Sequence, residues 1–199
     1  MPAPAFSLSL KGDEELADAL ERRLAPPEAL ADAAARGVSN LVVDHFRARN
    51  ASATRREGFP STGYWAQAAE ATVTDRQGCV ARVLVRAPGI RLHRYGGTVR
   101  PTSGKSLAIP ARAEVAGVWP REWAQREAQG LFFWWPKGRK AGALARREPS
   151  GHLTILWWLV GATHHRADPT VLPDESQMKS AAFDAALDAL DAYRAGRGA

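Results

Sequence analysis

Two short aromatic runs, at 131–135 and 153–160, constrain the fold of this 199-residue chain more than any other feature. Both are β-prone and bounded by turn residues, which indicates strands rather than helices. Each contains a pair of adjacent tryptophans: Trp134 and Trp135 in the first, Trp157 and Trp158 in the second. Because successive side chains of a strand point to opposite faces, the two rings of a pair cannot pack on one core. One ring of each pair must therefore contact a second surface, either a helix of the same protein or a subunit interface.

Turn residues around these runs predict an antiparallel meander. Residues 137–142 and 148–151 supply two turns, and residues 143–147 fit a third strand between them. Earlier in the chain, residues 72–85 alternate on either side of a glycine turn and predict a β-hairpin, and residues 6–10 show the period-2 pattern of a short strand.

Helical periodicity marks both ends of the chain. Residues 13–24 and 27–50 predict two N-terminal helices, and Asp174 with Gln177 fits a capping box at the start of a last helix. The apolar face of that last helix is predicted to comprise Met178, Ala182, Phe183, Ala186, Leu187, Leu190 and Tyr193.

These elements predict an α+β fold in which an antiparallel sheet, a β-meander, packs with N-terminal helices and a C-terminal helix. We expect a single domain over residues 1–199. Within it we expect an N-terminal strand or arm at 1–12, a basic hairpin insertion at 121–150 and a frayed tail at 194–199.

Composition narrows the class of protein. The chain is 45% hydrophobic and 24% charged, as expected of a soluble globular protein, and no run of 18 apolar residues predicts a membrane span. The N-terminus lacks a basic region followed by a long apolar region, so we expect cytosolic synthesis. The single cysteine, Cys79, rules out an internal disulfide framework, and we predict that it is buried as a small hydrophobe.

The net charge of +6 is unevenly distributed. Residues 1–32 carry −4 and residues 174–199 carry −2, so the residues between them carry +12. A basic body between acidic helices could bind nucleic acid or the acidic surface of a neighbouring subunit.

Motifs for catalysis or metal binding are weak. His164, His165 and Asp168 have ligand types, but adjacent histidines of a strand point to opposite faces, so we predict no metal site. His45 is predicted as a core or boundary histidine, because no ligand partner lies one helical turn away. Residues 103–106 resemble part of a phosphate-binding loop but precede a strand rather than a helix. We therefore expect no enzymatic activity and no cofactor.

Basic residues alternate with aromatics in the segment 121–147, which suits contact with nucleic acid through phosphate pairing and stacking. A basic hairpin tip also keeps a strand edge soluble, so the pattern has a structural explanation as well. The residues that we predict to face DNA are Arg139, Lys140, Arg146 and Arg147.

A glycine pair, Gly96 and Gly97, lies between an amphipathic turn and a strand. Glycine at such a corner accepts a positive φ or a close approach of another chain. The turn before it carries Arg91, Arg94 and Tyr95, which present positive charge and an aromatic ring at a surface. The pattern predicts either a plain turn with solvated arginines or a site of subunit contact.

The order of several motifs resembles the phage virion morphogenesis family, the Mu-type tail-completion proteins of bacteriophages and prophages. The similarity lies in Gly89-Ile90 with Tyr95-Gly96-Gly97-Thr98-Val99-x-Pro101, then Leu107-Ala108-Ile109-Pro110-Ala111, His45-Phe46, Tyr64-Trp65-x-x-Ala68-Ala69, and Trp158-Leu159-Val160 with Asp168-Pro169-x-x-Leu172-Pro173. It spans most of residues 38–190. The tryptophan-rich runs and the basic segment 121–147 depart from that pattern.

The resemblance implies a non-enzymatic structural protein that acts in tail completion or head-tail joining as a subunit of a ring. It implies contact with itself and with tail tube, tail terminator or head-tail connector proteins, transient contact with packaged DNA, and a location in the virion after assembly in the host cytoplasm. The residues that we expect at subunit or partner contacts are Arg91, Arg94, Tyr95, Gly96, Gly97, Trp134, Trp135, Trp157 and Trp158.

Overall fold

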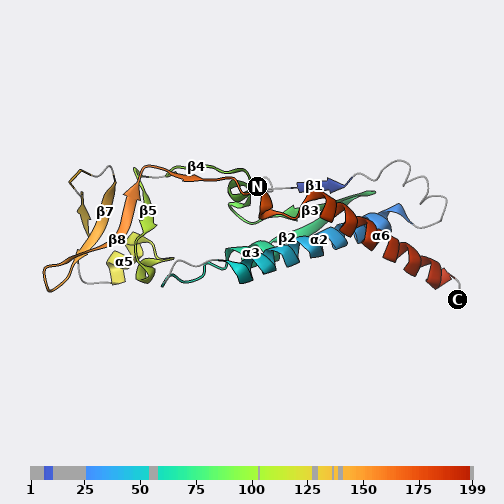
Figure 1. Cartoon of the computed structure of the whole chain (residues 1–199), viewed down its shortest axis with the longest axis horizontal. Helices are drawn as coiled ribbons and strands as arrows, with labels where there is room; N and C mark the ends of the chain where they lie inside the picture. Colours follow the sequence, from blue (N-terminus) through green and yellow to red (C-terminus); the bar gives the residue numbers. More distant parts are fainter. Residues whose placement is uncertain are drawn as a thin grey trace. The chain divides into compact units, whose positions relative to one another are not determined.

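The computed structural model describes residues 7–10, 26–53, 58–102, 104–126, 130–135, 137–138 and 141–197, with the side chains of 7–10, 124–126 and 197 excepted. The chain, which we expected to form a single domain, divides into two compact units. Unit 1 is drawn from Met1–Ala53, Gly63–Tyr95 and Ala167–Ala199, and unit 2 from Thr54–Thr62 and Gly96–Arg166. Figure 1 shows the elements of each unit.

Two long helices, α2 (Pro27–Ser52) and α6 (Glu175–Arg197), pack against each other in unit 1. Pro27 occupies the first turn of α2, where its missing N–H costs no hydrogen bond. The helices meet closely at Gly37, because a Cβ built there would lie 2.3 Å from the carbonyl oxygen of Ala181 and 2.6 Å from the Cβ of Ala185. Only a residue without a side chain fits this contact.

The capping box predicted for α6 is confirmed. The backbone N–H of Gln177 donates to Asp174 Oδ1 at 2.8 Å, and the backbone N–H of Asp174 donates to Gln177 Oε1 at 3.1 Å. These bonds hold the pKa of Asp174 below its usual value, with the bond from the Gln177 N–H as the main cause.

A three-stranded antiparallel sheet in the order β1-β3-β2 packs with α2 in unit 1. Its strands are β1 (Ser7–Leu10), β2 (Thr72–Gln77) and β3 (Val80–Val85), so both the N-terminal strand and the hairpin are confirmed. Shorter elements complete the unit: α3 (Tyr64–Glu70), α4 (Ile90–Tyr95) and the 3-10 helix η2 (Pro169–Val171).

The core of unit 1 is built from small and β-branched side chains of α2, α3, β3 and α6 around one large ring, Phe46. Val38, Phe46 and Val171 have no more than traces of exposed surface. A second contact between α2 and α6 buries Leu30 against Leu190. The helices and the sheet therefore cover each other within this unit.

Unit 2 contains a four-stranded antiparallel sheet in the order β5-β8-β7-β6. The strands are β5 (Leu107–Pro110), β6 (Phe132–Trp134), β7 (Gly142–Arg147) and β8 (Leu153–Val160). The predicted meander is confirmed as β6-β7-β8, and β5 adds a fourth strand beside β8. The 3-10 helix η1 (Ala113–Val115) and helix α5 (Pro120–Arg126) belong to the same unit.

Two further strands of unit 2, β4 (Gly97–Val99) and β9 (Thr163–His165), pair with each other as a separate ribbon. Gly96 and Gly97 have φ values of 70° and 145°, so the predicted glycine corner is confirmed. The strand that follows the corner lies in a two-stranded ribbon rather than in a core sheet.

Several expectations need correction or fall outside the described residues. Cys79 is exposed in the turn between β2 and β3, so the prediction that it is buried was wrong. The helix predicted at 13–24 lies outside the described residues. Helix α6 continues to Arg197, whereas we expected a frayed tail from residue 194. The segment 121–150 contributes α5, β6 and β7, and both strands are integral to the sheet of unit 2.

The apolar face predicted for α6 was only partly right. Met178, Ala182 and Leu190 are buried, but Phe183 and Leu187 are exposed. No helix of the described ranges combines the length and the apolar character needed to cross a membrane.

Candidate interaction surfaces

One face of the unit 2 sheet forms a small core. Trp157 is 1% exposed and packs with Leu156 of β8 and Val115 of η1. Trp123 of α5 meets the Trp157 ring edge to face, with the ring centroids 6.0 Å apart. One ring of the second tryptophan pair is therefore covered by helical segments of its own unit.

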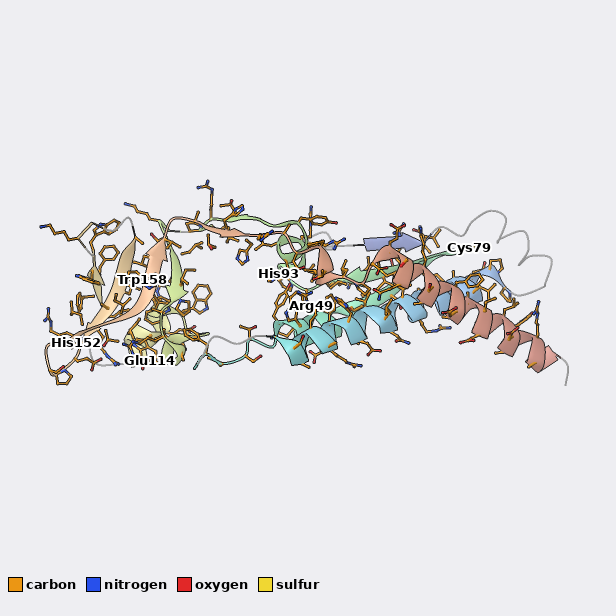
Figure 2. The ribbon with its side chains drawn as sticks, in the orientation of Figure 1. Arg49, Cys79, His93, Glu114, His152 and Trp158 are labelled. Carbon is orange, nitrogen blue, oxygen red and sulfur yellow. The ribbon has the colours of Figure 1, made fainter. Side chains whose placement is uncertain are left out.

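The opposite face of this sheet is also apolar. The β-ladder register pairs Trp158 with Ile109 on one side and Ala143 on the other, and pairs Trp134 with Ala143, so these side chains share a face. Trp134 and Trp158 are half-buried, and Ile109 is exposed. Figure 2 labels Trp158 on β8. An apolar sheet face with this much exposure is typical of a surface that contacts a partner.

A second aromatic surface lies at the edge strand β6. Phe133 and Trp135 are each 58% exposed, and their rings stack with centroids 5.8 Å apart and an interplanar angle of 28°. Both rings lie over the backbone of Gly142, since a Cβ built there would lie 2.8 Å from Phe133 Cζ and 3.0 Å from Trp135 Cε3. A glycine thus allows two large rings to lie flat at the surface of the sheet.

The basic residues predicted to face DNA have different surroundings. Arg146 forms an ion pair with Glu148, with Nη2 and Oε1 3.0 Å apart, and this bond is the main cause that lowers the pKa of Glu148. Arg147 is exposed and donates to the carbonyl of Gly151 at 3.3 Å. Arg139 and Lys140 lie outside the described residues.

The two units differ in net charge. Unit 2 has thirteen basic and five acidic residues, a net charge of +8, and unit 1 has fourteen basic and sixteen acidic residues, a net charge of −2. Exposed aromatic rings and positive charge therefore occur together in unit 2.

The residues predicted for subunit contact are distributed over both units. Arg91, Arg94 and Tyr95 belong to α4 of unit 1, whereas the tryptophan pairs belong to unit 2. Tyr95 is 61% exposed, Arg91 is exposed and Arg94 is half-buried. Trp157 belongs to the core instead, so of the two tryptophan pairs the available rings are Trp134, Trp135 and Trp158.

A cluster around Arg49 in unit 1 was not predicted from the sequence. The Arg49 guanidinium carbon lies 4.5 Å from the centroid of the Trp65 ring, and Nη2 lies 2.6 Å from Asp168 Oδ2. Arg49 Nη1 and His45 Nε2 both donate to the Thr170 carbonyl, at 2.8 and 2.9 Å. His45 is thus a boundary histidine, as predicted.

The Asp168 carboxylate completes this cluster. It accepts hydrogen bonds from the hydroxyl and the backbone N–H of Thr170 at 2.6 and 2.9 Å. These bonds, with the hydroxyl as the largest cause, and the nearby Arg49 lower the pKa of Asp168 from its ordinary 3.8 to about 2, against an opposing effect of burial. The cluster attaches the segment before α6 to α2, and its polar groups are used in that attachment.

Arg49 and His93 lie on α2 and α4, and Figure 2 labels both near this cluster. Trp65 contacts the His93 ring, with centroids 5.2 Å apart, and the Asp168 N–H donates to the His93 carbonyl at 2.9 Å. His45 and Arg49 are one helical turn apart, so the sequence places both on one face of a helix. Asp168, the partner of Arg49, is 119 residues away in sequence, and the spacing does not point to it.

The histidines of β9 do not form a metal site with their neighbours. His164 Nδ1 lies 3.1 Å from the hydroxyl of Thr98 on the paired strand β4. Asp168, the third residue of that motif, binds Arg49 in unit 1 instead. Within the described ranges, no group of three or more histidine, cysteine, aspartate or glutamate side chains could hold a metal ion.

Comparisons with protein-family models, with curated proteins and with solved structures found no match.

Proposed function

We propose that the chain is a non-enzymatic structural subunit of phage or prophage particles that acts in tail completion or head-tail joining as part of an oligomeric ring. The resemblance in motif order over residues 38–190 suggests the phage role. The partners proposed with it are further copies of the chain and tail tube, tail terminator or head-tail connector proteins.

The observation that carries a role in assembly is the exposed aromatic surface of unit 2. Phe133 and Trp135 are each 58% exposed and Trp158 is partly exposed, although the same sheet has a core around Trp157. Exposed rings of this size cost free energy in water, about 25 cal/mol per Å² of apolar area, so they favour a protein contact.

Light scattering coupled to size-exclusion chromatography tests whether the chain forms an oligomeric ring. Each chain has a mass of 21.5 kDa, so a ring gives a mass that is a fixed multiple of this value over a wide concentration range. A strict monomer at about millimolar concentration contradicts self-assembly of the free protein.

A deletion tests the phage role separately. In a phage or prophage that carries the gene, removing it should leave DNA-filled heads and tails that do not form infectious particles, as seen by electron microscopy. Wild-type protein supplied from a plasmid should restore the titre. An unchanged titre without the gene contradicts the proposal.

Binding of nucleic acid is the alternative function, and the net charge of +8 on unit 2 favours it. Arg146 forms an ion pair with Glu148, which reduces the contribution of Arg146 to DNA binding. The exposed Arg147 is therefore the better test residue. If this function is primary, duplex DNA binds with nanomolar affinity and a steep salt dependence, and Arg147→Ala lowers the salt slope by about one. Micromolar affinity that Arg147→Ala leaves unchanged contradicts it.

A further inference from the structure

Helix α6 carries an exposed apolar strip that its own unit does not cover. Phe183 is 49% exposed and Leu187 is 40% exposed, although they lie one turn apart on a helix whose opposite side contacts α2. Residues four apart lie on one face of a helix, so the two side chains form a continuous surface. The apolar residues Met178, Ala182 and Leu190 already supply the side that packs inward.

Acidic side chains lie along one side of this strip. Asp184, Asp188 and Asp191 are all exposed on the same helix, and of these Asp191 is paired with Arg194 at 3.4 Å. At 100° per residue, Asp184 and Asp191 lie beside Leu187 on the outer side of the helix. We call Phe183, Leu187, Asp184, Asp188 and Asp191 the α6 outer strip.

Unit 2 offers the complementary chemistry. The stacked pair Phe133–Trp135 is exposed, and the exposed Lys137 follows it in the next turn. The unit as a whole carries +8. Apolar rings beside positive charge match apolar side chains beside carboxylates.

We propose that the α6 outer strip of one copy binds the Phe133–Trp135 pair of a second copy. This inference rests on the proposed oligomeric ring, and it names the two surfaces through which neighbouring subunits would contact each other. Like surfaces would bring acid against acid or base against base, which disfavours a symmetric contact. A contact between two different patches leaves one patch free on each partner, so it propagates and can close into a ring.

The two patches form the centre of a larger contact. A stable interface buries about 800 Å² on each partner, and a few central aromatic side chains contribute most of its energy. Truncation of Phe133 and Trp135, or of the two apolar strip residues Phe183 and Leu187, should therefore weaken association strongly while the other residues of the contact stay unchanged.

Mixing two defective variants tests this arrangement. Phe133→Ser/Trp135→Ser keeps the α6 strip, and Phe183→Ser/Leu187→Ser keeps the rings. We expect the dissociation constant of each variant alone to rise at least about tenfold, so that each is monomeric where the wild type associates. An equimolar mixture should form a heterodimer of twice 21.5 kDa and no larger species, because only one intact contact is available.

Control variants separate this contact from general effects on folding. Trp119→Ser removes a ring that is 72% exposed outside the strands of unit 2, and Ala192→Ser changes another exposed position of α6. Both should associate like the wild type, and all variants should keep the wild-type circular dichroism spectrum and melting temperature.

The outcomes distinguish the two proposals. If the wild type and the double variants form oligomers equally well, self-assembly is supported but the two surfaces assigned to the contact are wrong. If the variants are monomeric but their mixture forms no heterodimer, the contact is not between these two patches. A monomeric wild type contradicts both the contact and the self-assembled ring, and the deletion experiment then decides the phage role independently.

Discussion

The two units differ in how completely each buries its apolar residues. In unit 1, small side chains of two helices and a sheet close around Phe46, and the polar residues near Trp65 bind one another. In unit 2, the core is centred on Trp157, while Phe133 and Trp135 of the same sheet stay 58% exposed. Unit 1 therefore has an extended core and exposes large apolar side chains on α4 and on the outside of α6, whereas unit 2 has a small core and exposes aromatic rings beside its sheet.

This difference changes which residues are candidates for function. The residues with the chemistry usually found in active sites, His45, Arg49 and Asp168, hold one segment of unit 1 to α2. Among the described residues, large apolar and aromatic side chains are exposed beside the sheet of unit 2 and on the outside of α6. Four predictions test this difference between the units.

The largest effect is expected for the tryptophan pair of β8. Trp157→Ala should destabilise unit 2 by about 3–5 kcal/mol, because it removes the central ring of a small core. Trp158→Ala should cost clearly less, since that ring is half-buried on the other face, and should weaken association instead. Urea unfolding monitored by far-UV circular dichroism measures the stability, and light scattering measures the association. An equal loss of stability in the two variants would contradict the assignment of Trp157 to the core face and Trp158 to the open face of the sheet.

Gly37 should show how tightly unit 1 is packed. Gly37→Ala places a Cβ 2.3 Å from the Ala181 carbonyl oxygen, which the backbone of α6 cannot avoid without moving. We expect a loss of about 2–3 kcal/mol even though alanine is the better helix former. The matched control is Gly196→Ala, also in a helix, where a Cβ meets nothing within 4 Å and stability should not fall. A stabilised Gly37→Ala variant would mean that the two helices do not meet as closely as described.

The Arg49–Asp168 pair should make unit 1 sensitive to acid. The lowered pKa of Asp168 means that the folded state favours the charged carboxylate, so its contribution is complete above about pH 4 and is lost as the pH falls toward 2. Because the pair is partly exposed to solvent, we expect about 1 kcal/mol. Asp168→Asn should be less stable than the wild type at pH 7, and the difference should vanish near pH 2. A difference independent of pH would indicate packing rather than charge.

The smallest effect is expected at Gly142, the counterpart of Gly37 in unit 2. An added Cβ there meets the ends of two exposed rings, Phe133 and Trp135, which can turn into solvent. Gly142→Ala should therefore cost less than about 1 kcal/mol, while it disturbs the stacked pair and weakens association. Tryptophan fluorescence and light scattering report the two effects. A large loss of stability would show that the rings are fixed parts of the fold.

Local patterns predicted most of the elements correctly. The hairpin 72–85, the strands around the tryptophan runs and the capping box of α6 follow from residues close together in sequence. Burial was predicted less well than secondary structure. Cys79 was expected to be buried in a strand, but it occupies the exposed turn of the hairpin.

The candidate surfaces were predicted only in part. Alternation along a strand required the two rings of each pair to face different surroundings, but it did not say which ring is buried. Contact with η1 and α5 selects Trp157, and this choice leaves Trp158 on the other face. The Arg49–Asp168 pair joins residues 119 positions apart, which periodicity does not reveal.

The sequence by itself determined the α+β class, the order of the strands along the chain and the concentration of positive charge in its middle, because periodicity, turn residues and charge are local properties. Only the tertiary structure decided which apolar side chains remain exposed. Phe183 and Leu187 fit the apolar face of α6 by sequence, yet α2 contacts the side that carries Met178, Ala182 and Leu190. Burial depends on what packs against a face, and that partner is chosen by the whole fold.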